Sequence, residues 1–276
     1  HRKGEGTDLW LQAFGSWGEL SGGEAMPVDR TIGGFFLGAD RMVAGWRVGV
    51  LGGYSQSSFS SDATRSSGNA DNYTLGVYGG RQWGALGLRL GAAYTYSDVD
   101  TDRTVMFPGY FDQLSASYGQ DTVQLFGELG YQVRQGGIGL EPFLNLAYVN
   151  VSSDGFVEQG GAAALVGQSG SSAMGFSTLG MRATGVVYVN GGNVVTARGL
   201  LGWRYGFGDA PTSTLSFVGG TPFAVTGVPV EGNSAVMELG LDSAITQAFT
   251  VGLAYAGQFG DTITDNGVLA NARWRF

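Results

Sequence analysis

The sequence predicts an all-β fold, a transmembrane antiparallel up-and-down β-barrel of about twelve strands. Apolar and polar residues alternate with a period of two over most of the chain, as strands with one apolar face require. No apolar run reaches the ~18 residues that a transmembrane helix needs, so strands must supply any membrane crossing. Short and long connections alternate along the chain, which is typical of bacterial outer-membrane barrels.

The alternation is clearest in three segments, Ala85–Asp98, Thr122–Arg134 and Val195–Phe207. In the first of them the leucines and tyrosines share one face, while glycines, Arg89 and Thr95 share the other. Side chains of a strand point to alternate faces, so each segment has one apolar and one polar side. The same period predicts strands that begin near residues 8, 32, 45, 70, 85, 117, 139, 172, 194, 234, 248 and 267.

The connections between these strands fall into two classes. The tight ones are Val43–Ala44, Gly84, Gln135–Gly137, Asn190–Gly192 and Thr246–Gln247. The mostly long ones, polar and rich in Gly and Ser, are Glu19–Thr31, Phe59–Asn69, Val99–Ala116, Ser152–Ser171, Gly208–Asn233 and Gly260–Asn266. Outer-membrane barrels have short periplasmic turns and longer extracellular loops. An even strand number then leaves both termini on the periplasmic side.

Aromatic and charged residues test this assignment of faces. Two aromatic girdles are expected on the lipid face, formed by Trp46, Trp83, Tyr131, Phe249 and Phe276 at the periplasmic ends and by Trp17, Tyr54, Tyr73, Tyr96, Tyr148, Tyr205 and Tyr255 at the outer ends. A lipid-facing Arg costs roughly 2–4 kcal/mol at mid-membrane and about 0–1 kcal/mol near an interface. Arg41 and Arg81 face outward only at strand ends, where the cost is small. A soluble β-sandwich would leave few aromatic residues at such positions.

Composition limits the chemistry that the chain can perform. With no Cys, neither a disulfide framework nor a thiolate metal site is available. The net charge of −8 argues against nucleic-acid binding. The single His is His1, so no Ser–His or Asp–His arrangement can form in the barrel, and the sequence has no GxSxG or GxxxxGK[ST] motif. We therefore expect no cofactor and no metal, and the lack of another His weakens the alternative of an outer-membrane protease or phospholipase, since these barrel enzymes rely on His.

The inward faces carry the charged residues of greatest interest. We expect these to be Asp40, Arg47, Arg89, Glu128, Glu141, Arg182, Arg198, Arg204, Glu238, Asp242, Arg273 and Arg275. Opposite charges on neighbouring strands pair and stiffen the wall. A barrel of about twelve strands has a lumen on the order of 10 Å, close to the ~10–12 Å diameter of one helix. Inward glycines either widen this lumen or relieve crowding in curved strands, at positions 38, 49, 76, 87, 91, 130, 180, 202, 240 and 252.

Six stretches in series resemble the translocator domain of type V autotransporters. They are Gly33–Ser55 (GGFFLGADRMVAGWRVGVLGGYS), the pair LFGELGYQV and EPFLNLAYVNV (Leu125–Val133 and Glu141–Val151), FVEQGGAAAL (Phe156–Leu165), STLGMRAT (Ser177–Thr184), GTPFAVTGVPV (Gly220–Val230) and the ending ARWRF (Ala272–Phe276). The resemblance implies a type V secretion pore in a Gram-negative outer membrane, in contact with lipid and lipopolysaccharide. It also implies a helix upstream of the first strand that plugs the lumen and joins an N-terminal passenger.

The resemblance also gives roles to several of these residues. Some lumenal charges would hold the linker helix or the passenger, and Glu128 or Glu238 would serve as a base in members that cut their own linker. The scissile segment of such members does not occur in this sequence. Trp274 and Phe276 form an aromatic-x-aromatic ending that resembles the signal read by the barrel-assembly machinery.

These expectations combine into one hypothesis. Residues 8–276 form the autotransporter β-barrel domain, and residues 1–7 (HRKGEGT) are a remnant of the linker or plug segment or of a trimmed end, in which most of the plug helix is missing. The domain would be a monomeric, non-enzymatic pore that exports and displays a passenger. The alternative is a free-standing porin or adhesin whose loops bind a ligand, and a third option is a self-cleaving domain.

Overall fold

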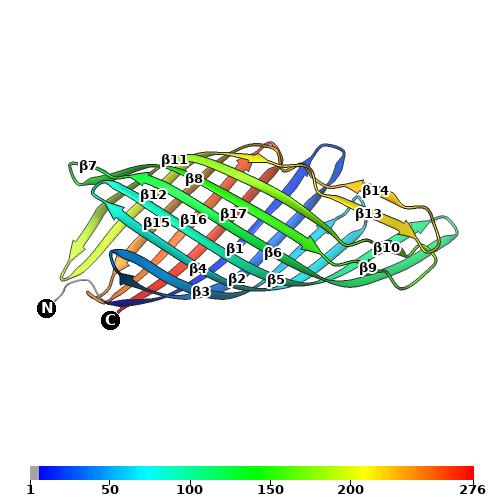
Figure 1. The fold of residues 1–276 in the computed structure, drawn as a ribbon, viewed down its shortest axis with the longest axis horizontal. Coiled ribbons are helices and arrows are strands. Elements are labelled where there is room, and N and C mark those ends of the chain that lie inside the picture. Colours follow the sequence, from blue (N-terminus) through cyan, green and yellow to red (C-terminus); the bar gives the residue numbers. More distant parts are fainter. Residues whose placement is uncertain (1–5) are drawn as a thin grey trace.

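Residues 6–276 of the computed structural model form a closed antiparallel β-barrel, so the predicted fold class is confirmed (Figure 1). Counting β6 and β7 as one, the barrel has twelve strands within this range. They are β1 (Thr7–Gly22), β2 (Ala25–Val43), β3 (Trp46–Ser61), β4 (Ser66–Trp83), β5 (Leu86–Phe107), β6 (Tyr110–Tyr131) with β7 (Val133–Gln135), β8 (Ile138–Ser153), β11 (Gly170–Asn190), β12 (Asn193–Phe207), β15 (Gly232–Ala244), β16 (Phe249–Gly260) and β17 (Ile263–Arg275). In the described part of the chain, no helix has the length and apolarity to cross a membrane.

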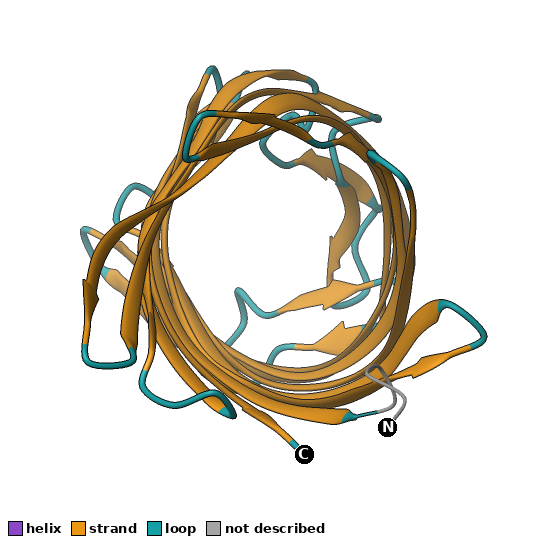
Figure 2. Cartoon of the chain, turned by 90° about the vertical axis from the view of Figure 1, so that its left-hand side faces the viewer, coloured by secondary structure: helices purple, strands orange, loops and turns teal. Residues whose placement is uncertain are grey.

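Each barrel strand pairs with its neighbours along the chain, and the first strand pairs with the last. The seam between β1 and β17 runs from the pair Asp8↔Arg275 to the pair Leu20↔Ile263. Closure satisfies the backbone groups of every wall strand and leaves no free edge in the wall. Seen along the barrel axis, the strands form a closed ring (Figure 2).

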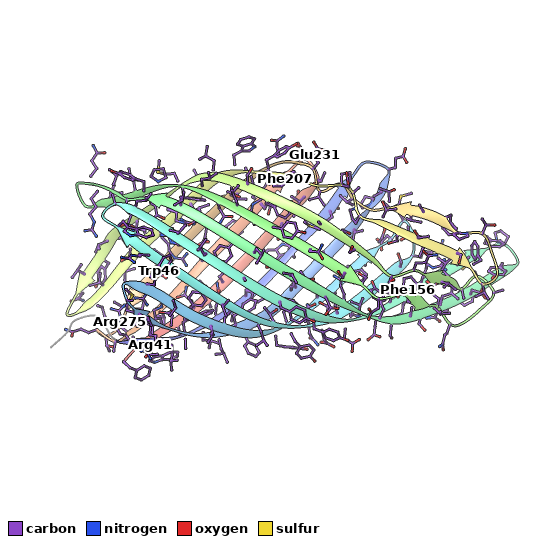
Figure 3. All side chains as sticks on the ribbon, in the orientation of Figure 1. Arg41, Trp46, Phe156, Phe207, Glu231 and Arg275 are labelled. Atoms are coloured by element: carbon purple, nitrogen blue, oxygen red, sulfur yellow. The ribbon has the colours of Figure 1, made fainter. Side chains whose placement is uncertain are left out.

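The two faces of the wall differ as the alternation predicts. Outward aliphatic side chains are strongly exposed, including Leu75 at 70%, Leu201 at 67% and Leu253 at 64%. A continuous apolar surface of this kind suits lipid and would be unfavourable in water. The aromatic rims frame it: Trp46 and Trp83 make an edge-to-face contact with ring centroids 5.9 Å apart. Trp46 lies at the end of the barrel that carries both termini (Figure 3).

Turns at the terminal end are tight, as predicted. Ala44 and Gly45 join β2 to β3 with φ values of 49° and 81°. Two successive residues with positive φ fit a type I′ turn, whose twist matches that of the flanking strands. Such turns fix the register of each hairpin, and register decides which side chains enter the lumen.

At the opposite end of the barrel, the predicted loops include residues that the structure places in strands. The segment expected as the loop Val99–Ala116 continues as strand, so β5 and β6 each have 22 residues and turn only at residues 108–109. Likewise β2 begins at Ala25, inside the loop expected for Glu19–Thr31. Beyond the membrane both faces of a ribbon can carry polar residues, so the period of two disappears from the sequence while the strand persists.

Four short strands form a second sheet at that end, namely β9 (Phe156–Val157), β10 (Leu165–Gly167), β13 (Thr212–Phe217) and β14 (Phe223–Thr226). We call this sheet, together with residues 99–116 of the β5–β6 hairpin, the outer lobe. The two parts meet at the bridge Ser115↔Gln159. Leu114 and Val99 are buried there, with 0% and 3% of their surface exposed, so the lobe has a small core of its own.

Candidate functional site in the barrel lumen

The twelve predicted lumenal charges lie on one face of the closed sheet. One row of paired residues runs from Arg204 through Thr178, Asn145 and Glu128 to Arg89, across β12, β11, β8, β6 and β5. A cavity of about 570 Å³ takes its walls from nine barrel strands and includes Glu128, Arg182, Arg204 and Glu238. Side chains from strands so far apart around the ring meet only in the lumen.

The largest charge cluster, here called the quartet, consists of Arg89, Glu128, Glu141 and Arg182. Arg89 donates two hydrogen bonds to Glu141, both of 3.0 Å, and one of 2.8 Å to Glu128. Arg182 donates two to Glu128, of 2.7 and 2.9 Å, and one of 2.8 Å to Glu141. Both carboxylates are buried. Two-pronged contacts of this kind are the strongest ion pairs in proteins.

Neutral groups complete the coordination of the quartet. Asn145 donates to Glu128 at 3.2 Å, Gln132 donates to Glu141 at 3.3 Å, and the Arg182 guanidinium lies 4.0 Å from the Phe143 ring centroid. The formal charges sum to zero, so the quartet ties β5, β6, β8 and β11 together without a net field. A carboxylate whose lone pairs already accept several N–H donors is a poor general base, which favours a structural role for Glu128.

A second cluster closes the seam and centres on Asp8, which the sequence reading missed. Asp8 is 2% exposed and lies 3.0 Å from Arg47, 3.2 Å from Arg275 and 3.8 Å from Arg273. Arg47 also pairs with Asp40. Asp8 lies four residues before Gln12 on β1, so both side chains are on the inward face of the strand. This alternation could have placed Asp8 in the lumen from the sequence.

Asp40 leads from the seam to an aromatic pair inside the lumen. Tyr78 donates to Asp40 at 2.7 Å and accepts a hydrogen bond of 2.6 Å from the Trp10 indole. The sequence reading also missed these two rings, because it reserved aromatic residues for the lipid face. A third cluster joins β12 to β15, where Arg198 contacts Glu238 and lies 2.9 Å from Asp242.

Arg204 has a different environment from these arginines. Its Nε donates to Thr178 Oγ1 at 3.0 Å, and its Nη1 donates to Gln258 Oε1 at 3.1 Å. Among residues 6–276 it forms no ion pair with a carboxylate, whereas each of the other six predicted lumenal arginines does. The structure therefore brings eleven of the twelve predicted charges into ion pairs and leaves Arg204 with neutral partners.

Several lumenal glycines lie beneath aromatic rings. A Cβ on Gly38 would come within 2.3 Å of Trp10, and one on Gly91 within 2.2 Å of Phe126. Gly49 faces Tyr78 and Gly180 faces Phe143 in the same way, at 2.3 and 2.6 Å. These glycines give rings of the neighbouring strand room to lie flat against the wall. The large lumenal side chains can therefore pack against the wall at glycine positions, which leaves space in the centre of the lumen.

The C-terminal strand presents different residues to its two sides. Arg273 and Arg275 turn inward to Asp8, while Trp274 stacks on Phe249 with centroids 4.7 Å apart. Phe276 is 74% exposed, and its N–H donates to the Thr7 carbonyl at 3.0 Å. Alternate residues at the C-terminal end thus have different roles: Trp274 and Phe276 form the aromatic ending, and Arg273 and Arg275 contribute to the seam.

Two further expectations concern metals and the N-terminal segment. In the part of the chain that the structure describes, no group of three or more His, Cys, Asp or Glu residues is arranged to hold a metal ion. The expected plug remnant at residues 1–7 falls mostly on residues 1–5, which lie outside the described residues, and β1 begins at Thr7.

Comparison with known proteins identifies this architecture. The family model described as "Autotransporter beta-domain" matches residues 9–256. The chain belongs to the autotransporter β-domain family. Two extracellular serine proteases of Serratia marcescens are 36% and 34% identical to it over 278 aligned residues, which cover 99% of the chain. The β-domain spans 26% of the length of these relatives. Their protease name therefore describes whole proteins, of which the β-domain matches about a quarter.

Solved structures agree on the fold. The translocator domain of the autotransporter NalP from Neisseria meningitidis has a TM-score of 0.76 at 16% identity, covering 100% of this chain and 90% of that one. The β-domain of the Bordetella autotransporter BrkA has a TM-score of 0.72 at 18% identity, covering 99% and 100%. The β-domain is thus a translocator barrel by family and by fold, which gives it a Gram-negative outer-membrane context and implies a passenger.

Proposed function

We propose that this β-domain exports an N-terminal passenger and displays it on the cell surface, with the linker to the passenger lying in the lumen. The observation that carries the proposal is a closed barrel of the autotransporter family whose lumen is polar and has room beside its charge clusters. We further propose that residues 8–276 form the export domain and that residues preceding them belong to the linker.

The orientation that we propose follows from the two ends of the barrel. Tight turns and both termini lie at one end, and the outer lobe lies at the other (Figure 1). Outer-membrane barrels keep their short turns in the periplasm and their large loops outside. The linker would therefore enter the lumen beside β1, and the passenger would emerge next to the outer lobe.

Two regions of the barrel would serve different steps. The quartet and the seam cluster would hold the wall in shape while a polypeptide passes. Trp274 and Phe276 would present the C-terminal strand to the barrel-assembly machinery, and the aliphatic belt would contact lipid and lipopolysaccharide. We propose that the barrel acts as a monomer, because its closed wall needs no second copy.

The proposed activity is transport without turnover chemistry. The carboxylates that could act as a base in linker cleavage, Glu128 and Glu238, are both engaged by arginines, which argues against that role. The Serratia relatives are named as extracellular serine proteases, so we propose a secreted hydrolase as the passenger. Labelling cells with a serine-directed fluorophosphonate probe tests that part separately.

The experiment is surface display from the full-length precursor. Protease added to intact cells should release the passenger from cells that make the whole protein. Precursor lacking residues 8–276 should leave the passenger in the periplasm, protected from the protease. Equal surface display without the barrel would contradict the proposal. A barrel with no upstream passenger in its gene would favour the alternative of a free-standing porin or adhesin.

A further inference from the structure

Arg81 lies on the lipid-facing side of β4, close to the end of the barrel that carries the termini. Its cross-strand partner is Leu88, and it lies two residues before Trp83, which is 45% exposed on the same face. The guanidinium carbon of Arg81 is 5.3 Å from the Trp83 ring centroid and 6.0 Å from that of Trp46. Cation–π attraction acts at these distances. The two indoles, which also contact each other, therefore hold the guanidinium at one place on the outer wall.

The protein gives this guanidinium no acceptor. Arg81 is half-buried, yet among residues 6–276 it forms no ion pair and donates no side-chain hydrogen bond, whereas Arg89 and Arg182 each bind two carboxylates. A Cβ on Gly45 would lie 3.7 Å from the guanidinium carbon of Arg81, so this group reaches the tight turn at the end of the β2–β3 hairpin. In a membrane that is the depth of the lipid headgroups. A guanidinium has five N–H donors, and those of Arg81 are available there to a ligand.

Charges on the outer face of the wall differ between its two ends. At the terminal end, Arg41 and Arg81 are the charged residues on the lipid-facing sides of the wall strands within the described range, and Arg41 lies near Trp46 at that end (Figure 3). At the opposite end this face carries carboxylates, such as the cross-strand partners Glu19 and Asp29, which are both exposed. The surface around Arg81 is therefore cationic and has no carboxylate to pair with the ammonium group of a zwitterionic lipid. Charge complementarity favours a ligand with a net negative charge.

This combination of arginine and indoles occupies one sector of the aromatic rim. The other aromatic pair at this end, Phe249 and Trp274, stacks directly, with ring centroids 4.7 Å apart. No guanidinium lies over that pair in the described part of the chain, since the three cation–π contacts involve Trp46, Trp83 and Phe143. Aromatic side chains alone are enough to hold a barrel at a membrane interface. The guanidinium between Trp46 and Trp83 thus adds a binding chemistry that membrane anchoring does not require.

We infer that Arg81, with Trp46 and Trp83, binds the phosphate of one anionic glycerophospholipid in the periplasmic leaflet of the outer membrane. The planar guanidinium would donate two parallel hydrogen bonds to two phosphate oxygens. The indoles would pack against the glycerol and the upper acyl carbons, and Arg41 would add attraction without direct contact. This inference goes beyond the proposed export function, and it uses the orientation proposed above.

Lipid titration of the purified β-domain in detergent micelles tests the site. Native mass spectrometry should show that the wild type retains one phosphatidylglycerol. R81Q should bind this lipid about tenfold more weakly, because a hydrogen-bonded charge pair is lost. R81K keeps the charge but loses the paired donors, so its affinity should fall between the two. R41Q should have a smaller effect, of at most about fivefold.

R134Q is the matched control variant. Arg134 is an exposed arginine on β7 at the same end of the barrel, and it has no cation–π contact with a ring of the described residues, so its loss should leave phosphatidylglycerol binding unchanged. Heat-dependent mobility in SDS gels verifies that each variant is folded. Phosphatidylglycerol with a photoreactive headgroup should label residues 44–46 or 81–84 in the wild type, and R81Q should lose this labelling.

Competition separates the possible sources of the phosphate. Phosphatidylethanolamine should bind more weakly than phosphatidylglycerol, because its ammonium group finds no carboxylate beside Arg81. Inorganic phosphate at the same concentration should not displace the lipid, since it has no acyl chains to pack against the indoles. Displacement of the lipid by lipopolysaccharide would assign Arg81 to a lipid of the outer leaflet and would overturn the periplasmic site.

Three further outcomes overturn the lipid site. In the first, folded R81Q binds phosphatidylglycerol as tightly as the wild type. In the second, R134Q weakens binding as much as R81Q, and in the third the photoreactive lipid labels all sectors of the rim equally. Surface display separates this inference from the proposed function, because R81Q should still display the passenger and lipid binding in micelles needs no passenger.

Discussion

The lumenal wall and the outer lobe of this barrel are stabilised in different ways. In the wall, charges on adjacent or next-nearest strands meet because register places them there, as Glu141 and Arg182 do as direct cross-strand partners. In the lobe, Arg103 reaches Glu158 across 55 residues of sequence, with hydrogen bonds of 3.1 and 2.6 Å. Around the wall, cross-strand register brings opposite charges together in the same way on many strands. The lobe instead depends on a few contacts between loops. We expect changes in the wall to affect assembly and changes in the lobe to stay local.

Deleting Phe276 should have the largest effect. It removes the exposed terminal ring and the hydrogen bond from the Phe276 N–H to Thr7 at the seam. The folded fraction in outer membranes, measured by heat-dependent gel mobility, should drop sharply. F276Y keeps both features and should assemble normally. Normal assembly of the deletion variant would remove the assembly role of this ending.

Removing both quartet carboxylates should have the next largest effect. The double variant E128Q/E141Q leaves Arg89 and Arg182 without counter-charges in a partly buried site. Breaking a buried pair costs about 3–5 kcal/mol, and water in the lumen reduces this, so we expect on the order of 2–3 kcal/mol. Urea unfolding in detergent micelles measures it. The fourfold variant that also carries R89Q and R182Q should recover part of the loss, and a still less stable fourfold variant would contradict the ion-pair account.

The wall was largely readable from the sequence. Alternation fixed which side of each strand faces inward, so Arg89 and Arg182 could be assigned to the lumen before their partners were known. Alternation shows which face a residue is on but not which contacts it makes there. Trp10 and Tyr78 were missed because aromatic residues were expected only on the lipid-facing side. Asp8 was missed at the edge of the first strand. The outer lobe was not predicted, because its strands are two to six residues long and form only through contacts distant in sequence.

Breaking the Arg103–Glu158 pair should affect the lobe alone. The variant R103A removes two hydrogen bonds to Glu158 and one of 2.9 Å to the Ala163 carbonyl. Limited chymotrypsin digestion should then cut at Phe156 or Leu165 several times faster than in wild type. The heat stability of the barrel should not change measurably. A large loss of barrel assembly in R103A would show that lobe and wall fold as one unit.

Acid should loosen the lobe through Asp112, the smallest effect that we predict. Its carboxylate accepts a hydrogen bond from Tyr110 and another of 2.9 Å from the Ala163 N–H, and these bonds lower the pKa of Asp112. A group whose pKa is lowered by folding stabilises the fold above its unfolded value, about 3.9 for Asp, and loses that contribution as the pH falls through the folded value. Hydrogen exchange at Ala163, corrected for intrinsic rates, should be constant from about pH 7 to 5 and rise below about pH 4. D112N should exchange faster throughout and lose this dependence.

Cysteine cross-linking during export tests most directly the claim that the lumen is the path and seat of the linker. The β-domain has no Cys, so a single Cys can be placed in the wall and another in the linker of the full-length precursor. Asn145 faces the cavity, while its neighbour Leu146 is 55% exposed on the outer face. We predict that N145C forms a disulfide with the linker in cells that display the passenger and that L146C does not. Cells that display the passenger while N145C and other cavity positions never cross-link would contradict the account.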